Sequence, residues 1–141
     1  MTQYSVVYDA FLARILEDEW EDWQLEEAKA DWRQILEAAL YWFKFPRVSL
    51  EHGESGFSGD LSPMEVQIIA NYMKCEWLNR CIMTWDNVKP LYDERDFSPA
   101  NLLDKLRQQV DKERANAREL ESIYYRSIDG KPFDYTALGQ N

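Results

Sequence analysis

The sequence predicts an all-α protein: a four-helix bundle-like domain over residues 1–126, with a long C-terminal helix, followed by an extended C-terminal tail over residues 127–141. Apolar side chains recur at three- and four-residue spacing in four separate stretches, which is the pattern of amphipathic helices. Two Ser-Pro pairs mark helix starts, and all five glycines fall between the predicted helices or in the tail. With 141 residues, of which 45% are hydrophobic, the chain is long enough to bury a single core.

The first two predicted helices flank a strongly acidic segment. One helix spans about residues 8–20 and the next about residues 25–43, each with an apolar stripe. Residues 17–27 carry seven carboxylates, and this segment either prolongs the first helix or turns into the second. Pro46 ends the second helix, because the residue before a proline avoids the α conformation.

The third predicted helix has the clearest start in the sequence. Residues 48–61 contain three glycines and indicate a loop, after which Ser-Pro-Met-Glu at 62–65 supplies an N-cap, a first-turn proline and a capping box. The helix continues to about residue 84 or 88 and is apolar on two sides. A helix with one wet face needs only one apolar stripe. It is therefore either the central helix of the domain or a helix packed between the domain and a neighbouring subunit.

The last predicted helix, about residues 99–126, begins at the second Ser-Pro pair. Its narrow apolar stripe and mixed-charge outer face are typical of a helix that projects or packs along one seam. Residues 127–141 have no helical period, and they are either a frayed terminus or an arm that orders on a partner. The apolar side chains spaced through this arm, which would make that contact, are Ile128, Phe133, Tyr135 and Leu138.

The net charge of −10 is unevenly distributed. Residues 1–70 contain 14 acidic and 5 basic side chains, whereas residues 71–141 contain 12 and 11. This argues against a duplex-binding surface in the first half, because phosphate contacts need clustered lysine and arginine, although an acidic wall can still line a path for DNA. No apolar run approaches the roughly 20 residues that cross a bilayer, and no secretory signal is visible. We therefore expect a cytosolic or virion protein without a membrane partner.

The sequence offers little for catalysis or for a cofactor. His52 is the single histidine, and a catalytic site would have to be built around it in a predicted loop. Zinc and di-iron sites need several histidine or cysteine ligands. Cys75 and Cys81 lie six residues apart on an apolar helix, too far for a disulfide, and are expected to be small core residues. We expect no enzymatic activity, no cofactor and no metal.

Four carboxylates of the acidic segment form one candidate site. Glu17 and Glu21, and likewise Asp18 and Asp22, would lie one helical turn apart, where their oxygens could hold a hard cation. Like charges at that spacing are also common on solvated faces, at a cost of a few tenths of a kcal/mol. A solvated face or the acidic wall of a channel is therefore the preferred interpretation.

Aromatic side chains provide a second candidate site. Trp20 and Trp23 lie among carboxylates in the sequence, a setting that is unfavourable for burial in the chain's own core. Protein interfaces are enriched in tryptophan and tyrosine, and the doubly apolar third helix also favours a contact between subunits. The predicted intersubunit contacts are Trp20, Trp23, Tyr72, Trp77 and Trp85.

Several short sequence segments resemble those of the small head–tail connector proteins, also called adaptor or neck proteins, of tailed double-stranded DNA bacteriophages. They are Phe-Lys-Phe-Pro-Arg at 43–47, Leu-Ser-Pro-Met-Glu-Val at 61–66, Met-Lys-Cys-Glu-Trp-Leu at 73–78, Asp-Phe-Ser-Pro-Ala-Asn-Leu-Leu at 96–103 and Tyr-Tyr-Arg at 124–126. The resemblance covers about residues 8–126, and the acidic segment 17–27 departs from it.

The resemblance implies a homo-oligomeric ring, commonly twelve-fold, that joins the portal protein to the next neck or tail protein at the head–tail junction of the virion. Assembly would take place in the host cytoplasm, and double-stranded DNA would pass through a central channel without specific binding. The helix that faces this channel is left open. Two other functions also remain open: a tail terminator or completion protein, which would carry more strand, and a small acidic regulator that binds a host protein.

Overall fold

The computed structural model describes residues 1–15, 20–88, 99–128 and 131–132, and it confirms the all-α prediction. Helices account for most of these residues, and the short strands form two antiparallel pairs. The elements in chain order are β1 (Thr2–Gln3), α1 (Tyr4–Leu12), α2 (Leu25–Leu40), β2 (Gly56–Phe57), α3 (Pro63–Val88), α4 (Pro99–Tyr125), β3 (Ser127–Ile128) and β4 (Lys131–Pro132).

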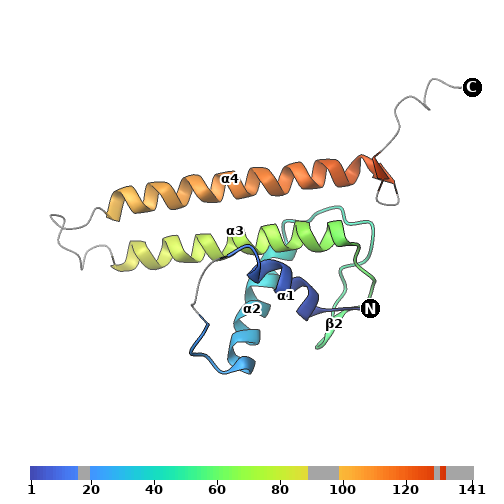
Figure 1. The fold of residues 1–141 in the computed structure, drawn as a ribbon, viewed down its shortest axis with the longest axis horizontal. Helices are drawn as coiled ribbons and strands as arrows, with labels where there is room; N and C mark the ends of the chain where they lie inside the picture. The colour runs from blue at the N-terminus through green and yellow to red at the C-terminus, as the bar shows by residue number, and fades with distance from the viewer. Residues whose placement is uncertain (16–19, 89–98, 129–130, 133–141) are drawn as a thin grey trace, which may run out of the picture.

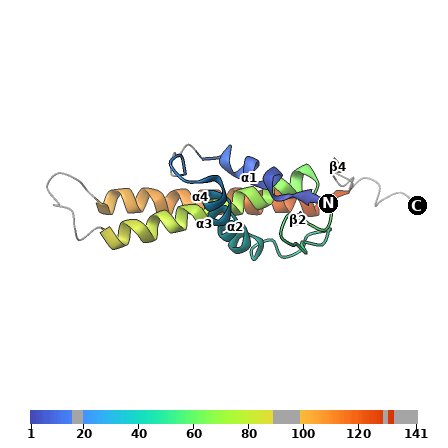
Figure 2. The same cartoon turned by 90° about the horizontal axis from the view of Figure 1, so that it is seen from below.

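The two longest helices, α3 and α4, run antiparallel and side by side (Figure 1). Helices α1 and α2 pack against α3 on the side away from α4, and α2 crosses α3 steeply (Figures 1 and 2). α3 is therefore the central helix, which was one of the two predicted alternatives. Its two apolar sides are explained by contacts within the chain over its first and middle parts, because α4 covers one side and α1 and α2 cover the other (Figure 1); Met83, near its end, is 66% exposed.

The start of α3 is fixed by the predicted capping box. The Glu65 backbone N–H donates a hydrogen bond to Ser62 Oγ at 3.2 Å, and the Ser62 N–H donates one to Glu65 Oε1 at 2.7 Å. Glu65 is buried and also accepts a hydrogen bond from Tyr124 Oη at 2.9 Å. The same carboxylate thus caps α3 and fastens its start to the end of α4.

The predicted boundaries of the first helix are wrong. α1 begins at Tyr4 and ends at Leu12, instead of spanning residues 8–20. Its buried residues are Tyr4, Val7, Tyr8 and Phe11. Trp20 packs edge-on against Phe11, with ring centroids 6.1 Å apart. A straight helix would carry Trp20 roughly 13 Å beyond Phe11, so the chain has to leave the helix before it can return.

The described part of the acidic segment, residues 20–27, turns into α2 instead of prolonging α1. α2 begins at Leu25, as predicted, but ends at Leu40, three residues early. The N–H groups of Trp42 and Phe43 bond to carbonyl oxygens three residues back, which tightens the turn that follows the helix. α3 ends at Val88, the later of the two predicted ends. α4 ends at Tyr125, one residue before the predicted end at residue 126.

A short strand, β2, lies in the loop predicted over residues 48–61 and was not expected. It pairs with β1, with Thr2 opposite Phe57 and Gln3 opposite Gly56. A Cβ atom at Gly56 would collide with the carbonyl oxygen of Thr2, so glycine is needed for the two backbones to approach this closely. The pair holds the N-terminus against the loop, where Phe57 is fully buried.

Candidate interaction surfaces

Three of the aromatic side chains predicted to contact another subunit lie inside the chain's own core. Trp20, Tyr72 and Trp77 are 8%, 4% and 7% exposed. Trp23 is 42% exposed, and the side chain of Trp85 lies outside the described part of the structure. Of the described predicted contacts, Trp23 is therefore the side chain that remains exposed to a neighbouring subunit, and on α3 the exposed large apolar side chain among residues 63–84 is Met83, at 66%.

Trp20 is held in the core by an ion pair that links α2 to α3. Its indole Nε1 donates a hydrogen bond to Asp31 Oδ2 at 2.7 Å, and Arg80 donates one to Asp31 Oδ1, also at 2.7 Å. Burial raises the pKa of Asp31, but the hydrogen bonds from Arg80 and Trp20 outweigh it, so the pKa of this carboxyl lies below its usual value. The Asp31 carboxylate of α2 thus connects Trp20, which precedes the exposed part of the acidic segment, to both α2 and α3.

The residues that follow Trp20 form an exposed acidic surface, which we call the acidic tip (residues 21–27). All seven side chains are exposed, and four of them are carboxylates. Trp23 and Leu25 are the large apolar side chains of the tip, with exposures of 42% and 60%. Of the predicted channel face, Glu21 and Asp22 belong to the tip, whereas Glu17 and Asp18 lie outside the described residues.

A second exposed surface is both basic and aromatic. We call it the basic aromatic patch and define it by Lys44, Phe45, Arg47, Tyr125 and Arg126, all of which are exposed. Phe45 is 73% exposed, and its ring meets that of Tyr125 edge-on with centroids 6.4 Å apart. The patch joins the segment after α2 to the end of α4. It was not predicted, because its two parts are almost 80 residues apart in the sequence.

The basic aromatic patch rests on a hydrogen-bonded network. The Arg47 backbone N–H donates to Tyr124 Oη at 2.6 Å, and this hydroxyl donates to Glu65. The Arg47 guanidinium lies 4.8 Å from the centre of the Tyr124 ring and donates to the Tyr125 carbonyl oxygen at 3.1 Å. Burial is the main cause that raises the pKa of Tyr124; the Arg47 N–H opposes it and Glu65 adds to it. The phenol therefore remains a neutral donor.

The acidic tip and the basic aromatic patch lie at opposite ends of α2. The tip includes the first turn of the helix, and the patch begins four residues after its last residue. The start of α2 lies at the bottom of the molecule in Figure 1, whereas the helix runs up toward α3. Sixteen residues of α-helix span roughly 24 Å. One molecule therefore cannot bring its own tip against its own patch.

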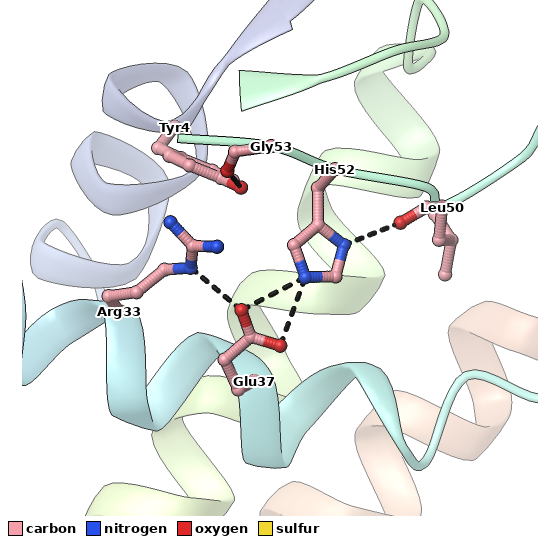
Figure 3. Close-up of polar contacts among 6 residues, drawn as sticks. All are labelled: Tyr4, Arg33, Glu37, Leu50, His52 and Gly53. Carbon is pink, nitrogen blue, oxygen red and sulfur yellow. Dashed lines mark hydrogen bonds and ion pairs between the residues drawn. The ribbon is translucent and has the colours of Figure 1, made fainter. Parts of the chain in front are cut away.

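The single histidine ties the loop before α3 to α2 (Figure 3). His52 Nδ1 lies 2.7 Å from the carbonyl oxygen of Leu50, and Nε2 lies 2.9 and 3.0 Å from the two carboxylate oxygens of Glu37. Arg33 also donates to Glu37, at 2.7 Å. Burial raises the pKa of Glu37, but the hydrogen bonds from Arg33 and His52 outweigh it and lower the pKa on balance. Both ring nitrogens of His52 are thus engaged in holding the loop.

An open groove of about 540 Å³ lies beside this cluster, between α1, α2 and the loop. Lys29 and Arg33 line it together with Glu26 and Glu54, so that neither sign of charge dominates. The Arg33 guanidinium is already occupied, because it lies 4.4 Å from the centre of the Tyr4 ring and binds a carboxylate of α2. The groove therefore shows no preference for an anionic or a cationic ligand.

The cysteines are free thiols in or near the core, as predicted. Cys75 is buried and Cys81 is partly buried. Burial raises the pKa of Cys75 to about 11, so its thiol is protonated near neutral pH. Within the described ranges, no group of three or more histidine, cysteine or acidic side chains is placed to hold a metal ion. Over the same ranges, no helix combines the length and the apolar character needed to cross a membrane.

The predicted C-terminal arm starts beside the basic aromatic patch. Ile128 falls in β3, which pairs with β4 in a hairpin directly after α4. Phe133, Tyr135 and Leu138 lie outside the described residues. Because β3 begins two residues after Tyr125, the arm leaves the helical domain next to the exposed Phe45 and Tyr125 rings.

Comparison with known proteins shows no relative of this chain. No protein-family model, no curated protein and no solved structure matches it. A function therefore has to be inferred from the exposed surfaces, from the arm that leaves beside one of them and from the sequence phrases described above.

Proposed function

We propose that the chain is a structural virion protein: a head–tail connector that forms a homo-oligomeric ring between the portal and the neck or tail of a tailed bacteriophage. The main support is the exposure of large apolar side chains near both ends of α2, beside a well-packed core. Leu25 is 60% exposed at one end, and Tyr41 and Phe45 are 75% and 73% exposed at the other. Apolar side chains gathered on a surface mark contact sites, and a protein that works inside an assembly covers them there.

The surplus negative charge is consistent with a ring around DNA. Each copy carries a net charge of −10, and a closed ring repeats that charge around its axis. A negatively charged channel repels phosphates, so DNA would pass without binding specifically. The proposed channel face, carried over from the sequence, is Glu17, Asp18, Glu21 and Asp22.

The C-terminal arm is the proposed contact with the portal protein or with the next neck protein. Apolar side chains spaced along an irregular segment suit a groove or a strand edge on another protein. The segment begins two residues after Tyr125, whose exposed ring lies against that of Phe45, so a partner bound by the arm would lie next to these rings. The proposed contact residues are Ile128, Phe133, Tyr135 and Leu138.

Two other functions fit the molecule less well. A tail terminator or completion protein is expected to carry more strand, whereas the strands in the described part of this chain are two residues long. A regulator that imitates the charge of DNA needs carboxylates throughout its contact surface. The cations Lys44, Arg47 and Arg126 beside the exposed rings are unfavourable for that role. The exposed apolar side chains, the net negative charge and the apolar residues of the arm favour a connector.

Native mass spectrometry of the full chain mixed with the portal protein tests the proposal. We expect a complex in which the number of copies matches the symmetry of the portal, commonly twelve. The matched control is a variant that ends at residue 128, which keeps the helical domain but lacks most of the arm. We expect this variant to fold and to lose most of its binding to the portal.

Cryo-microscopy of assembled particles provides the second measurement, with density for the ring expected directly below the portal. The proposal is refuted if the chain is absent from purified particles and does not bind the portal. Capture of a host nucleic-acid enzyme by the same chain would then favour the regulator.

A further inference from the structure

The surfaces at the two ends of α2 are complementary in charge. The basic aromatic patch carries the cations Lys44, Arg47 and Arg126, and the acidic tip carries four carboxylates. Each surface also exposes two large apolar side chains. They are Phe45 and Tyr125 in the patch and Trp23 and Leu25 in the tip. Apolar side chains surrounded by charges of opposite sign are the composition expected of two surfaces that bind each other.

The charges of both surfaces remain available for a partner. Within the described part of the chain, the four carboxylates of the tip form no hydrogen bond or ion pair, and neither does the Lys44 ammonium group. Arg126 donates to the Ser122 carbonyl oxygen of its own helix, and Arg47 donates to the carbonyl oxygen of Tyr125. Those acceptors are neutral, so the positive charge of the patch is not cancelled by them. Among the described residues, the Glu121 carboxylate accepts a hydrogen bond from Tyr125 at 2.8 Å and forms no ion pair with Arg47 or Arg126.

We infer that the basic aromatic patch of one copy binds the acidic tip of a second copy of the same chain. The two surfaces are separated by the length of α2, roughly 24 Å, so the contact has to form between molecules. A contact between two different surfaces of identical chains is heterologous, and repeating it gives a closed ring when the rotation closes. The inference rests on the proposed ring and assigns the surfaces that close it.

This contact removes part of the proposed channel face. Glu21 and Asp22 belong to the acidic tip, and in the ring they would lie against the patch of a neighbour rather than against DNA. The two roles exclude each other, so the oligomerisation experiment described next also decides between them. Glu17 and Asp18 are not part of the tip and are unaffected by this assignment.

Two charge-reversal variants of the full chain test the contact. In the patch variant, Lys44→Glu and Arg126→Glu make the patch acidic; in the tip variant, Asp22→Lys, Glu26→Lys and Glu27→Lys make the tip basic. Self-association of each variant alone is expected to weaken at least about tenfold relative to the wild type, because like charges then face each other. An equimolar mixture of the two variants is expected to recover association, since every patch can then meet a tip of opposite charge.

Sedimentation velocity up to about 1 mM chain, followed by native mass spectrometry of the mixture, provides the measurement. In the mixture the two variants should alternate, so the oligomers should contain equal numbers of each. Matched controls reverse exposed charges of α4, with Lys105→Glu and Lys112→Glu for the patch variant and Asp104→Lys, Asp111→Lys and Glu119→Lys for the tip variant. These controls are expected to associate like the wild type.

Each remaining outcome overturns the inference. A wild-type chain that stays monomeric at about 1 mM, variants that associate unchanged, or a mixture without recovery would each show that the patch and the tip do not bind each other. The proposed connector function fails separately, through the portal and particle experiments above. A ring found below the portal with intact association of both variants would keep the function and reject this contact.

Discussion

The two ends of α2 each expose apolar side chains among charges, of opposite sign, and the two surfaces rest on different supports. The acidic tip is held through Trp20, whose indole binds the Asp31 carboxylate, and the paired Arg80 is 36% exposed in its side chain. The basic aromatic patch rests on Tyr124 and Glu65, which are 4% and 3% exposed. One support is an ion pair partly open to water, and the other is a hydroxyl enclosed by protein. Because the supports differ, the two surfaces are expected to respond differently to substitution and to pH.

Removing the ion pair below the acidic tip is expected to have the largest effect. Asp31→Ala removes the acceptor of the buried Trp20 indole N–H and breaks the ion pair between α2 and α3, which should lower the free energy of unfolding by about 2–3 kcal/mol. Urea denaturation followed by tryptophan fluorescence measures this. The matched control is Asp22→Ala, an exposed carboxylate of the tip, which should change stability by less than about 0.5 kcal/mol. Equal effects of the two substitutions would show that the ion pair does not support the tip.

Removing the hydroxyl below the basic aromatic patch is expected to cost less. Tyr124→Phe keeps the ring against Arg47 but loses the hydrogen bond to Glu65 and the one from the Arg47 N–H, at about 1–2 kcal/mol. Tyr125→Phe is the control, because its hydroxyl binds Glu121 at an exposed position. A larger loss of stability in the Tyr125 variant than in the Tyr124 variant would contradict the role assigned to the enclosed hydroxyl.

Acid should weaken the support of the tip. The pKa of Asp31 lies below its unfolded value, so its contribution to stability is complete above the ordinary aspartate range, near about pH 4, and is lost as the pH falls through the folded pKa. The stability difference between the wild type and Asp31→Ala should therefore narrow between pH 6 and pH 2.5. Urea denaturation at a series of pH values measures this difference. A difference that widens with acid would show that the sign of the shift is wrong.

The smallest effect on stability is expected from the exposed apolar side chains themselves. Leu25→Ser and Phe45→Ser remove side chains that are 60% and 73% exposed, so the free energy of unfolding should change by less than about 0.5 kcal/mol. Thermal unfolding monitored by circular dichroism checks this. Losses above 2 kcal/mol would mean that these side chains serve the fold rather than a partner, and the comparison between the two ends of α2 would lose its basis.

Local signals in the sequence predicted four helices, and the starts of α2, α3 and α4 are as predicted. The start of α3 is determined by residues close together in the sequence, because Ser62 and Glu65 hydrogen-bond to each other across the first turn that Pro63 begins. The start of α1 was also visible, because Tyr4, Val7, Tyr8 and Phe11 have helical spacing, but the stripe was begun at the wrong residue. Trp20 could not be placed in this way. Its burial depends on Asp31 and Arg80, which only the fold brings to it.

The basic aromatic patch could not be predicted from any local pattern in the sequence. Phe45 and Arg47 follow α2, and Tyr125 ends α4, so their proximity depends on the antiparallel packing of α3 and α4. Both stretches belong to the phrases that carry the resemblance to connector proteins, but in the sequence they indicate only helix ends. The acidic tip is the opposite case, because its composition is continuous along the chain and only the exposure of Trp23 and Leu25 had to come from the structure.

The length of α2 has a geometric consequence for any ring built through its two ends. The helix fixes the spacing between the surface that a molecule offers to the preceding copy and the surface that it offers to the following copy. Each added residue would lengthen that spacing by about 1.5 Å and would rotate the tip relative to the patch by about 100°. Circumference and copy number would thus be encoded in the residue count of one sixteen-residue segment.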